Sequence, residues 1–101
     1  MSELTGSQKE NTTYVLREIF GISCEKPSDK IAEDLAASIM KLSRCSKAIG
    51  LVPIPGPLAG GKVAQILVNM AKQLRNKNVS PHCINALILS KKSDFMIACL
   101  G

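Results

Sequence analysis

Residues 58–76 read LAGGKVAQILVNMAKQLRN, and this stretch decides the fold class. Apolar side chains recur in it every three or four residues, which is the period of one face of an α-helix. The members of this stripe are Val63, Ile66, Leu67, Met70, Ala71 and Leu74. The residues that face away are Lys62, Gln65, Asn69, Lys72, Gln73 and Asn76. The stretch therefore predicts an amphipathic helix that buries one face in a helical core.

Two more helices are predicted on the N-terminal side of this stretch. Ser7-Gln8-Lys9-Glu10 matches a capping box and Gly21 suits a helix end, so a helix is expected over residues 8–20. A second helix is expected to start around Pro27-Ser28-Asp29 and to close near Gly50, since its apolar residues keep the helical period. These residues are Ile31, Leu35, Ile39, Leu42, Cys45 and Ile49.

The segment Leu51–Pro57 interrupts the helical pattern with three alternating prolines, which predict a stiff, extended connector. It is apolar enough that we expect it to pack onto the bundle. Further on, Ser80 is a suitable cap and Pro81 a suitable first residue for a fourth helix. The run Lys91-Lys92-Ser93-Asp94 either ends that helix or restarts a short fifth one.

The length and composition fit one small domain. A chain of 101 residues, 46% of them hydrophobic, can hold one modest core, so residues 1–101 are expected to form a single helical domain. The predicted fold class is all-α, a small antiparallel helical bundle of four to five helices. Its expected core is Ile19, Leu35, Ile39, Leu42, Ile66, Met70, Leu74, Ile84, Leu87 and Ile88.

The charges divide sharply along the chain. Residues 1–40 hold four basic and seven acidic residues, whereas residues 41–101 hold nine basic residues and one acidic residue, Asp94. The second part therefore carries a net charge of +8, and no carboxylate lies between Asp34 and Asp94. Such an imbalance either solubilises exposed helix faces or creates a field that attracts anionic surfaces.

The four cysteines, Cys24, Cys45, Cys83 and Cys99, form no C-x-x-C pair. We expect buried, reduced thiols of a cytoplasmic protein, because Met1–Thr13 also lacks the apolar segment of a secretory signal. His82 and Cys83 would point about 100° apart on a helix, which disfavours a shared metal. Nothing in the sequence shows whether Cys24 and Cys45 meet, or whether either faces His82 as a nucleophile pair.

The segment Gly56–Val63 fits G-x-x-x-x-G-K but has Val63 where a phosphate loop needs a Ser or Thr for magnesium. Prolines also replace the strand that should precede it. A simpler interpretation remains, in which the start of this helix and Lys62 bind an anion such as a lipid phosphate. With a single His and acids confined mostly to the first 34 residues, we expect no enzyme, no metal and no cofactor.

Part of the chain resembles a known family. Residues 52–61, VPIPGPLAGG, are followed by an amphipathic helix ending in LRNKN at 74–78 and then by Cys83. Over residues 47–90 this resembles the N-terminal helical domain of fungal signalling and cell-death proteins, of the mixed-lineage-kinase-like or HeLo-type four-helix class. The resemblance implies a helical bundle that signals by association and in some relatives attacks anionic membranes. It implies no catalytic residue.

The expected function is a non-enzymatic interaction or signalling module that uses a basic face to hold an acidic partner. One alternative is a helical bundle that binds or permeabilises anionic membranes, and another is a small nucleic-acid-binding protein. Nucleic acid is less favoured because only two of the nine basic residues in the second part are Arg. A cytoplasmic location is expected, with peripheral membrane association and homo-oligomer formation left open. The candidate binding residues are Lys41, Arg44, Lys47, Lys62, Lys72, Arg75 and Lys77.

Overall fold

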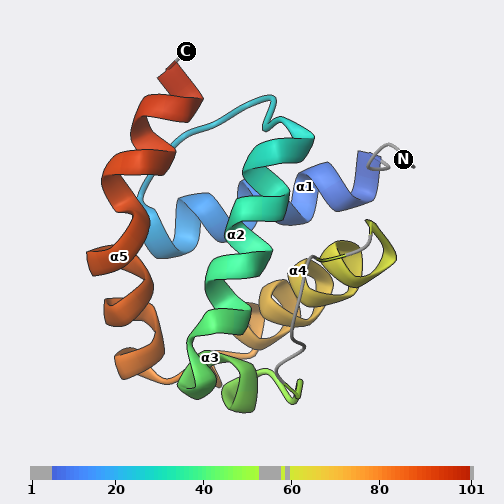
Figure 1. Ribbon diagram of the computed structural model, residues 1–101, viewed down its shortest axis with the longest axis vertical. Coiled ribbons are helices and arrows are strands. Elements are labelled where there is room, and N and C mark those ends of the chain that lie inside the picture. Colours follow the sequence, from blue (N-terminus) through green and yellow to red (C-terminus); the bar gives the residue numbers. More distant parts are fainter. Residues whose placement is uncertain (1–5, 53–57, 59, 101) are drawn as a thin grey trace.

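The computed structural model describes residues 6–52, 58 and 60–100, with side chains from residue 8 onward. Within these residues the chain forms five α-helices and no strand, which confirms the all-α bundle. Figure 1 shows α2 and α5 side by side and pointing in opposite directions, with α1 crossing behind α2. The elements are α1 (Gly6–Val15), the π-helical turn η1 (Leu16–Phe20), α2 (Asp29–Lys41), α3 (Ser43–Ala48), α4 (Gly60–Arg75) and α5 (Pro81–Leu100).

The first helix, α1 with η1, begins two residues before its expected start and ends at Phe20 as predicted. Gly21 has a φ of 67°, a left-handed conformation that glycine adopts without steric cost. Its N–H donates to the carbonyl of Arg17, and the N–H of Ile22 reaches the carbonyl of Leu16. These two bonds satisfy carbonyls at the helix end, so the predicted glycine stop is confirmed. The side chain of Ser7, and with it the capping box, lies outside the described residues.

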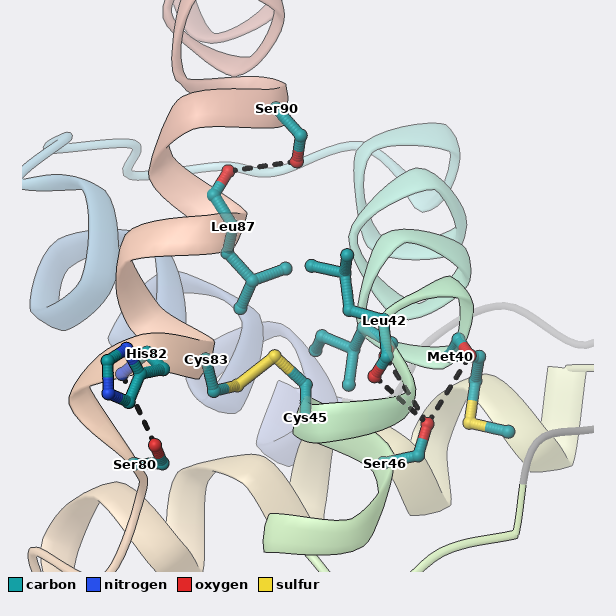
Figure 2. The surroundings of a disulfide bond; sticks show 10 residues. Met40, Leu42, Cys45, Ser46, Ser80, His82, Cys83, Leu87 and Ser90 are labelled. Carbon is teal, nitrogen blue, oxygen red and sulfur yellow. Dashed lines mark hydrogen bonds between the residues drawn. A yellow bond between two sulfur atoms is a disulfide. The ribbon is translucent and has the colours of Figure 1, made fainter.

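The predicted single helix from residue 27 to 50 is wrong, because Leu42 breaks it into α2 and α3. The start is as expected: the Ser28 hydroxyl accepts a hydrogen bond from the N–H of Ile31. At Leu42 the backbone is extended, with φ −92° and ψ 99°. The hydroxyl of Ser46 lies 3.3–3.5 Å from the carbonyl oxygens around this break, those of Ile39, Met40 and Leu42 (Figure 2). A side chain thus satisfies the end of α2 while the chain turns.

The connector before α4 is described only at its edges. Leu51 and Leu58 are partly buried against the core, while Val52 is exposed. The proline-rich residues 53–57 and residue 59 lie outside the described part, and with them residues 56, 57 and 59 of the phosphate-loop-like motif. The amphipathic helix itself is confirmed as α4, with its bounds at Gly60 and Arg75.

The last helix, α5, is continuous, so neither the break nor the restart expected at residues 91–94 occurs. It starts at Pro81, as predicted, and the Ser80 hydroxyl accepts a hydrogen bond from the N–H of His82. In the run where a break was expected, the Lys91 ammonium lies 3.7 Å from the Asp94 carboxylate, an i,i+3 pair that suits a helix. Charged residues here continue the helix instead of ending it.

The core lies where the five helices meet. Six of the ten expected core residues are buried: Ile19, Leu35, Ile39, Ile66, Met70 and Leu87. The other four are partly buried and pack against them: Leu42, Leu74, Ile84 and Ile88. The structure adds Phe95, whose ring lies 5.3 Å from that of Phe20. This contact fixes the second half of α5 against η1.

Candidate functional site

A disulfide bond joins Cys45 on α3 to Cys83 in the first turn of α5. The expectation of four reduced thiols is therefore wrong for this pair, whose Cα atoms are 4.9 Å apart and whose residues are both fully buried. The break at Leu42 turns α3 so that Cys45 faces Cys83, as Figure 2 shows. Cys45 is consequently no free thiol for a nucleophile pair with His82, which is exposed.

The disulfide also gathers positive charge at one end of the molecule. It holds α3 beside the turn that leads from α4 into α5, at the lower end of Figure 1. Two segments far apart in sequence, residues 41–47 and 72–77, both lie toward this end of the molecule. Their exposed cations define what we call the basic end: Lys41, Arg44, Lys47, Lys72 and Lys77.

None of the five cations of the basic end forms an ion pair within the described part of the chain. The salt bridges found there are Arg17–Glu18 and Lys91–Asp94, both away from this end. The described acidic residues of the first part of the chain lie on α1, on η1, on the loop after η1 and in the first half of α2. Glu33 and Asp34 lie eight and seven residues before Lys41 on α2, roughly 10–12 Å along the helix, and neither forms an ion pair with the basic end. The basic end therefore has no internal counter-charge.

Two of the seven candidate binding residues do not belong to the basic end. Lys62 lies in the first turn of α4, ten residues or roughly 15 Å along the helix from Lys72. Arg75 is used within the fold, because its guanidinium donates to the amide oxygen of Asn11 at 3.2 Å and lies 4.7 Å from the ring centre of Tyr14. Arg75 thus ties α4 to α1.

The cations of the basic end also have a structural role. Lys41, Lys47 and Lys72 lie in the last turns of α2, α3 and α4, where a positive charge complements the helix dipole. Each such contact stabilises an exposed helix end by about 0.3–1 kcal/mol. Any test of binding at this end must therefore separate a loss of affinity from a loss of stability.

Sequence reasoning missed a second surface, the apolar face of α5. Four large apolar side chains of this helix are exposed, with Leu89 and Leu100 above 85%: Leu89, Met96, Ile97 and Leu100. The opposite side of the same helix is buried through Cys83, Leu87 and Phe95. Because apolar residues occur all around α5, no amphipathic period indicates which side of this helix faces solvent.

Two shallow hollows lie on the described surface. One, of about 330 Å³, is lined by the segment Phe20–Ser23 and by Lys92, Met96, Cys99 and Leu100 from α5. The other, of about 350 Å³, has mixed charges and lies between α1, η1 and Glu25. The first hollow places the free thiol of Cys99 beside the loop that carries the other free cysteine, Cys24.

The structure and the comparisons add three findings. No group of three or more His, Cys, Asp or Glu side chains comes together to hold a metal among the described residues. No helix in the same part of the chain has the length and apolarity that a bilayer span requires. No family model, curated protein or solved structure matches the chain. Of the resemblance drawn from the sequence, the structure supports a small, compact, all-helical globule.

Proposed function

We propose that the chain is a non-enzymatic interaction module whose basic end binds an acidic stretch of a partner protein. The observation that carries this proposal is the set of five exposed, unpaired cations around the Cys45–Cys83 bond. An exposed charge without an internal counter-charge keeps its full attraction for a partner. Spread over two segments, these cations span a surface rather than a single point.

The surroundings of the basic end favour a protein over a membrane. The exposed residues beside its cations are polar, such as Ser43, Asn76 and Asn78. The large exposed apolar side chains of α5 lie from Leu89 to Leu100, in the half of that helix away from the disulfide. Insertion into lipid needs apolar groups next to the charges, whereas pairing with carboxylates does not.

The disulfide supports this proposal in a second way. It links α3 to the start of α5, so the two cationic segments are held together before a partner arrives. Preorganisation of this kind lowers the entropic cost of binding. Because disulfides persist mainly in oxidising compartments, we propose that the module works in such an environment and not in the cytoplasm.

The test compares two triple variants of equal charge. Lys41→Glu, Lys47→Glu and Lys77→Glu alter the basic end, whereas the control changes Lys30, Lys62 and Lys92 to Glu. Each triple lowers the formal net charge from +5 to −1. The probe is fluorescent polyglutamate, titrated at low and physiological salt, with duplex DNA of similar charge in a parallel arm.

The basic-end triple is expected to bind polyglutamate at least about tenfold more weakly than the control triple, because three attractive contacts of roughly 1 kcal/mol each become repulsive. Urea unfolding of both triples separates this effect from lost helix-dipole stability. Equal affinity of the two triples would mean that only net charge matters, which contradicts the proposal. Tighter binding to DNA than to polyglutamate would favour the nucleic-acid alternative.

A second candidate function rests on the apolar face of α5. Leu89, Ile97 and Leu100 are exposed together, and Lys92 lies near them, which suits contact with an anionic lipid surface. The resemblance to HeLo-type domains, some of which attack such membranes, supports the same proposal. Cosedimentation with phosphatidylcholine vesicles, with and without phosphatidylserine, tests it. Changing Leu89, Ile97 and Leu100 to Ser should abolish binding, whereas the Lys41, Lys47 and Lys77 triple should keep most of it.

A further inference from the structure

The two free cysteines lie near each other in the fold. Cys24 is buried in the loop between η1 and α2, and Cys99 is partly exposed in the last turn of α5. Cys99 lines a hollow together with the segment Phe20–Ser23, which leads directly into Cys24, and it packs against the apolar cluster in which Cys24 is buried. They are 75 residues apart in sequence, so only the fold brings them together.

This proximity is built by the packing around the pair. The rings of Phe20 and Phe95 are in contact at 5.3 Å, and each cysteine follows its aromatic residue by four positions. On α5 those four positions rise only about 6 Å and keep Cys99 on the face of Phe95. On the loop, the Thr13 hydroxyl donates to the carbonyl oxygen of Cys24 at 3.3 Å, which fixes the backbone of this residue.

A small oxidant can reach the pair from one side. Cys99 lines the 330 Å³ hollow together with the segment Phe20–Ser23, and its side chain is partly exposed there. Cys24 lies behind it, buried in the same apolar cluster against which Cys99 packs. An incoming disulfide therefore meets Cys99 first and brings its sulfur next to the second thiol.

We propose that Cys24 and Cys99 close a second disulfide by exchange with a small disulfide such as oxidised glutathione. The Cys99 thiol loses its proton and attacks one glutathione sulfur, which forms a mixed disulfide and releases one glutathione as thiolate. The Cys24 thiol then loses its proton and attacks the Cys99 sulfur, which releases the second glutathione. In balance, two protein thiols are oxidised and one glutathione disulfide is reduced to two thiols.

The second bond would hold α5 at both ends. Cys83 already ties the start of this helix to α3, and Cys99 lies sixteen residues or about 24 Å further along it. Between these points, the helix is anchored mainly by Leu87 and Phe95. A small helical domain with two such crosslinks would resemble the small domains that disulfide bonds stabilise.

The experiment uses the folded wild-type chain with its Cys45–Cys83 bond intact. It is incubated with a glutathione redox buffer at pH 8 until the intact mass no longer changes, because only a small fraction of the Cys99 thiol is deprotonated at this pH. The number of alkylatable thiols and a nonreducing peptide map are then recorded. We expect a loss of two hydrogen atoms per chain, no alkylatable thiol and a crosslinked peptide pair containing Cys24 and Cys99. The midpoint of thermal unfolding should rise by about 10 °C or more.

Two single variants show that the pairing is specific. Cys24→Ser should leave Cys99 as a glutathione adduct, and Cys99→Ser should leave Cys24 reduced because it is buried. The proposal is overturned if the oxidised wild type keeps two alkylatable thiols, carries glutathione on Cys99 without closing, or links these cysteines between chains. The peptide map of the wild type decides this outcome even where a variant fails to fold.

Discussion

Replacing the Cys45–Cys83 pair by two alanines should remove a large share of the stability of this fold. The bond closes a loop with a sequence separation of 38 residues. In the chain-entropy description, a loop of that length restricts the unfolded state by about 4 kcal/mol, and native disulfides of small domains contribute about 2–5 kcal/mol. Total stabilities of such domains are only about 5–15 kcal/mol. We therefore expect the double variant to lose about 3–4 kcal/mol.

The assay is urea unfolding followed by circular dichroism, with thermal unfolding in parallel. A loss of this size lowers the midpoint temperature by roughly 10–20 °C for a chain of this length. Wild type in a reductant should unfold like the double variant. The control is Cys24→Ala, which removes a buried sulfur but leaves the bond in place. Free energies of unfolding within about 1 kcal/mol for the double variant and the wild type would refute the reasoning.

Three further predictions concern single contacts. A double-mutant cycle of Phe20→Leu and Phe95→Leu should give a coupling energy of about 0.5–1.5 kcal/mol by urea unfolding, because the two rings touch; additive losses would show that the rings only fill space. Ser28→Ala should cost about 1 kcal/mol because the cap of α2 is lost, whereas Ser23→Ala, at an exposed position in the loop before it, should leave the unfolding midpoint unchanged. Burial, with the neighbouring Cys24 thiol, raises the pKa of Cys99 from 9.0 to about 12; its alkylation rate in the reduced chain should therefore still rise above pH 9, where an ordinary thiol levels off. Since the folded state then holds this proton more tightly than the unfolded state, stability should fall as pH rises from about 9 to 12, and a flat profile would contradict the shift.

The parts of the fold that follow a single helical period could be predicted from the sequence. The stripe Val63–Leu74 predicts α4 within two residues at either end, and Ser80-Pro81 predicts the start of α5. The break at Leu42 could not be predicted, because the apolar period continues through it from Ile39 to Cys45. The break allows Cys45 to face Cys83, which is a tertiary contact. No local sequence pattern in α3 indicates this contact.

For the candidate site, the sequence predicts which residues are basic but not how they are arranged in space. The excess of positive charge after residue 40 is visible in the sequence, but its gathering at one end depends on the disulfide. Arg75 shows why a count of charges is not enough to define the site. By sequence it is one of the basic candidates, but in the fold its guanidinium contacts Asn11 and Tyr14. The wide, irregular spacing of four cysteines gives no connectivity, because three pairings are compatible with it.

The exposed apolar face of α5 follows from how this helix is held and not from its own pattern. With apolar residues on every side, hydrophobicity alone does not select which side is buried. The selection comes from the bond of Cys83 to α3, from the contact of Phe95 with Phe20, and from the packing of Cys99 against the core. Leu89, Ile97 and Leu100 remain exposed, so specific contacts, one of them covalent, keep exposed an area that hydrophobicity alone would bury. The fold therefore keeps two distinct surfaces exposed, this apolar face and the basic end.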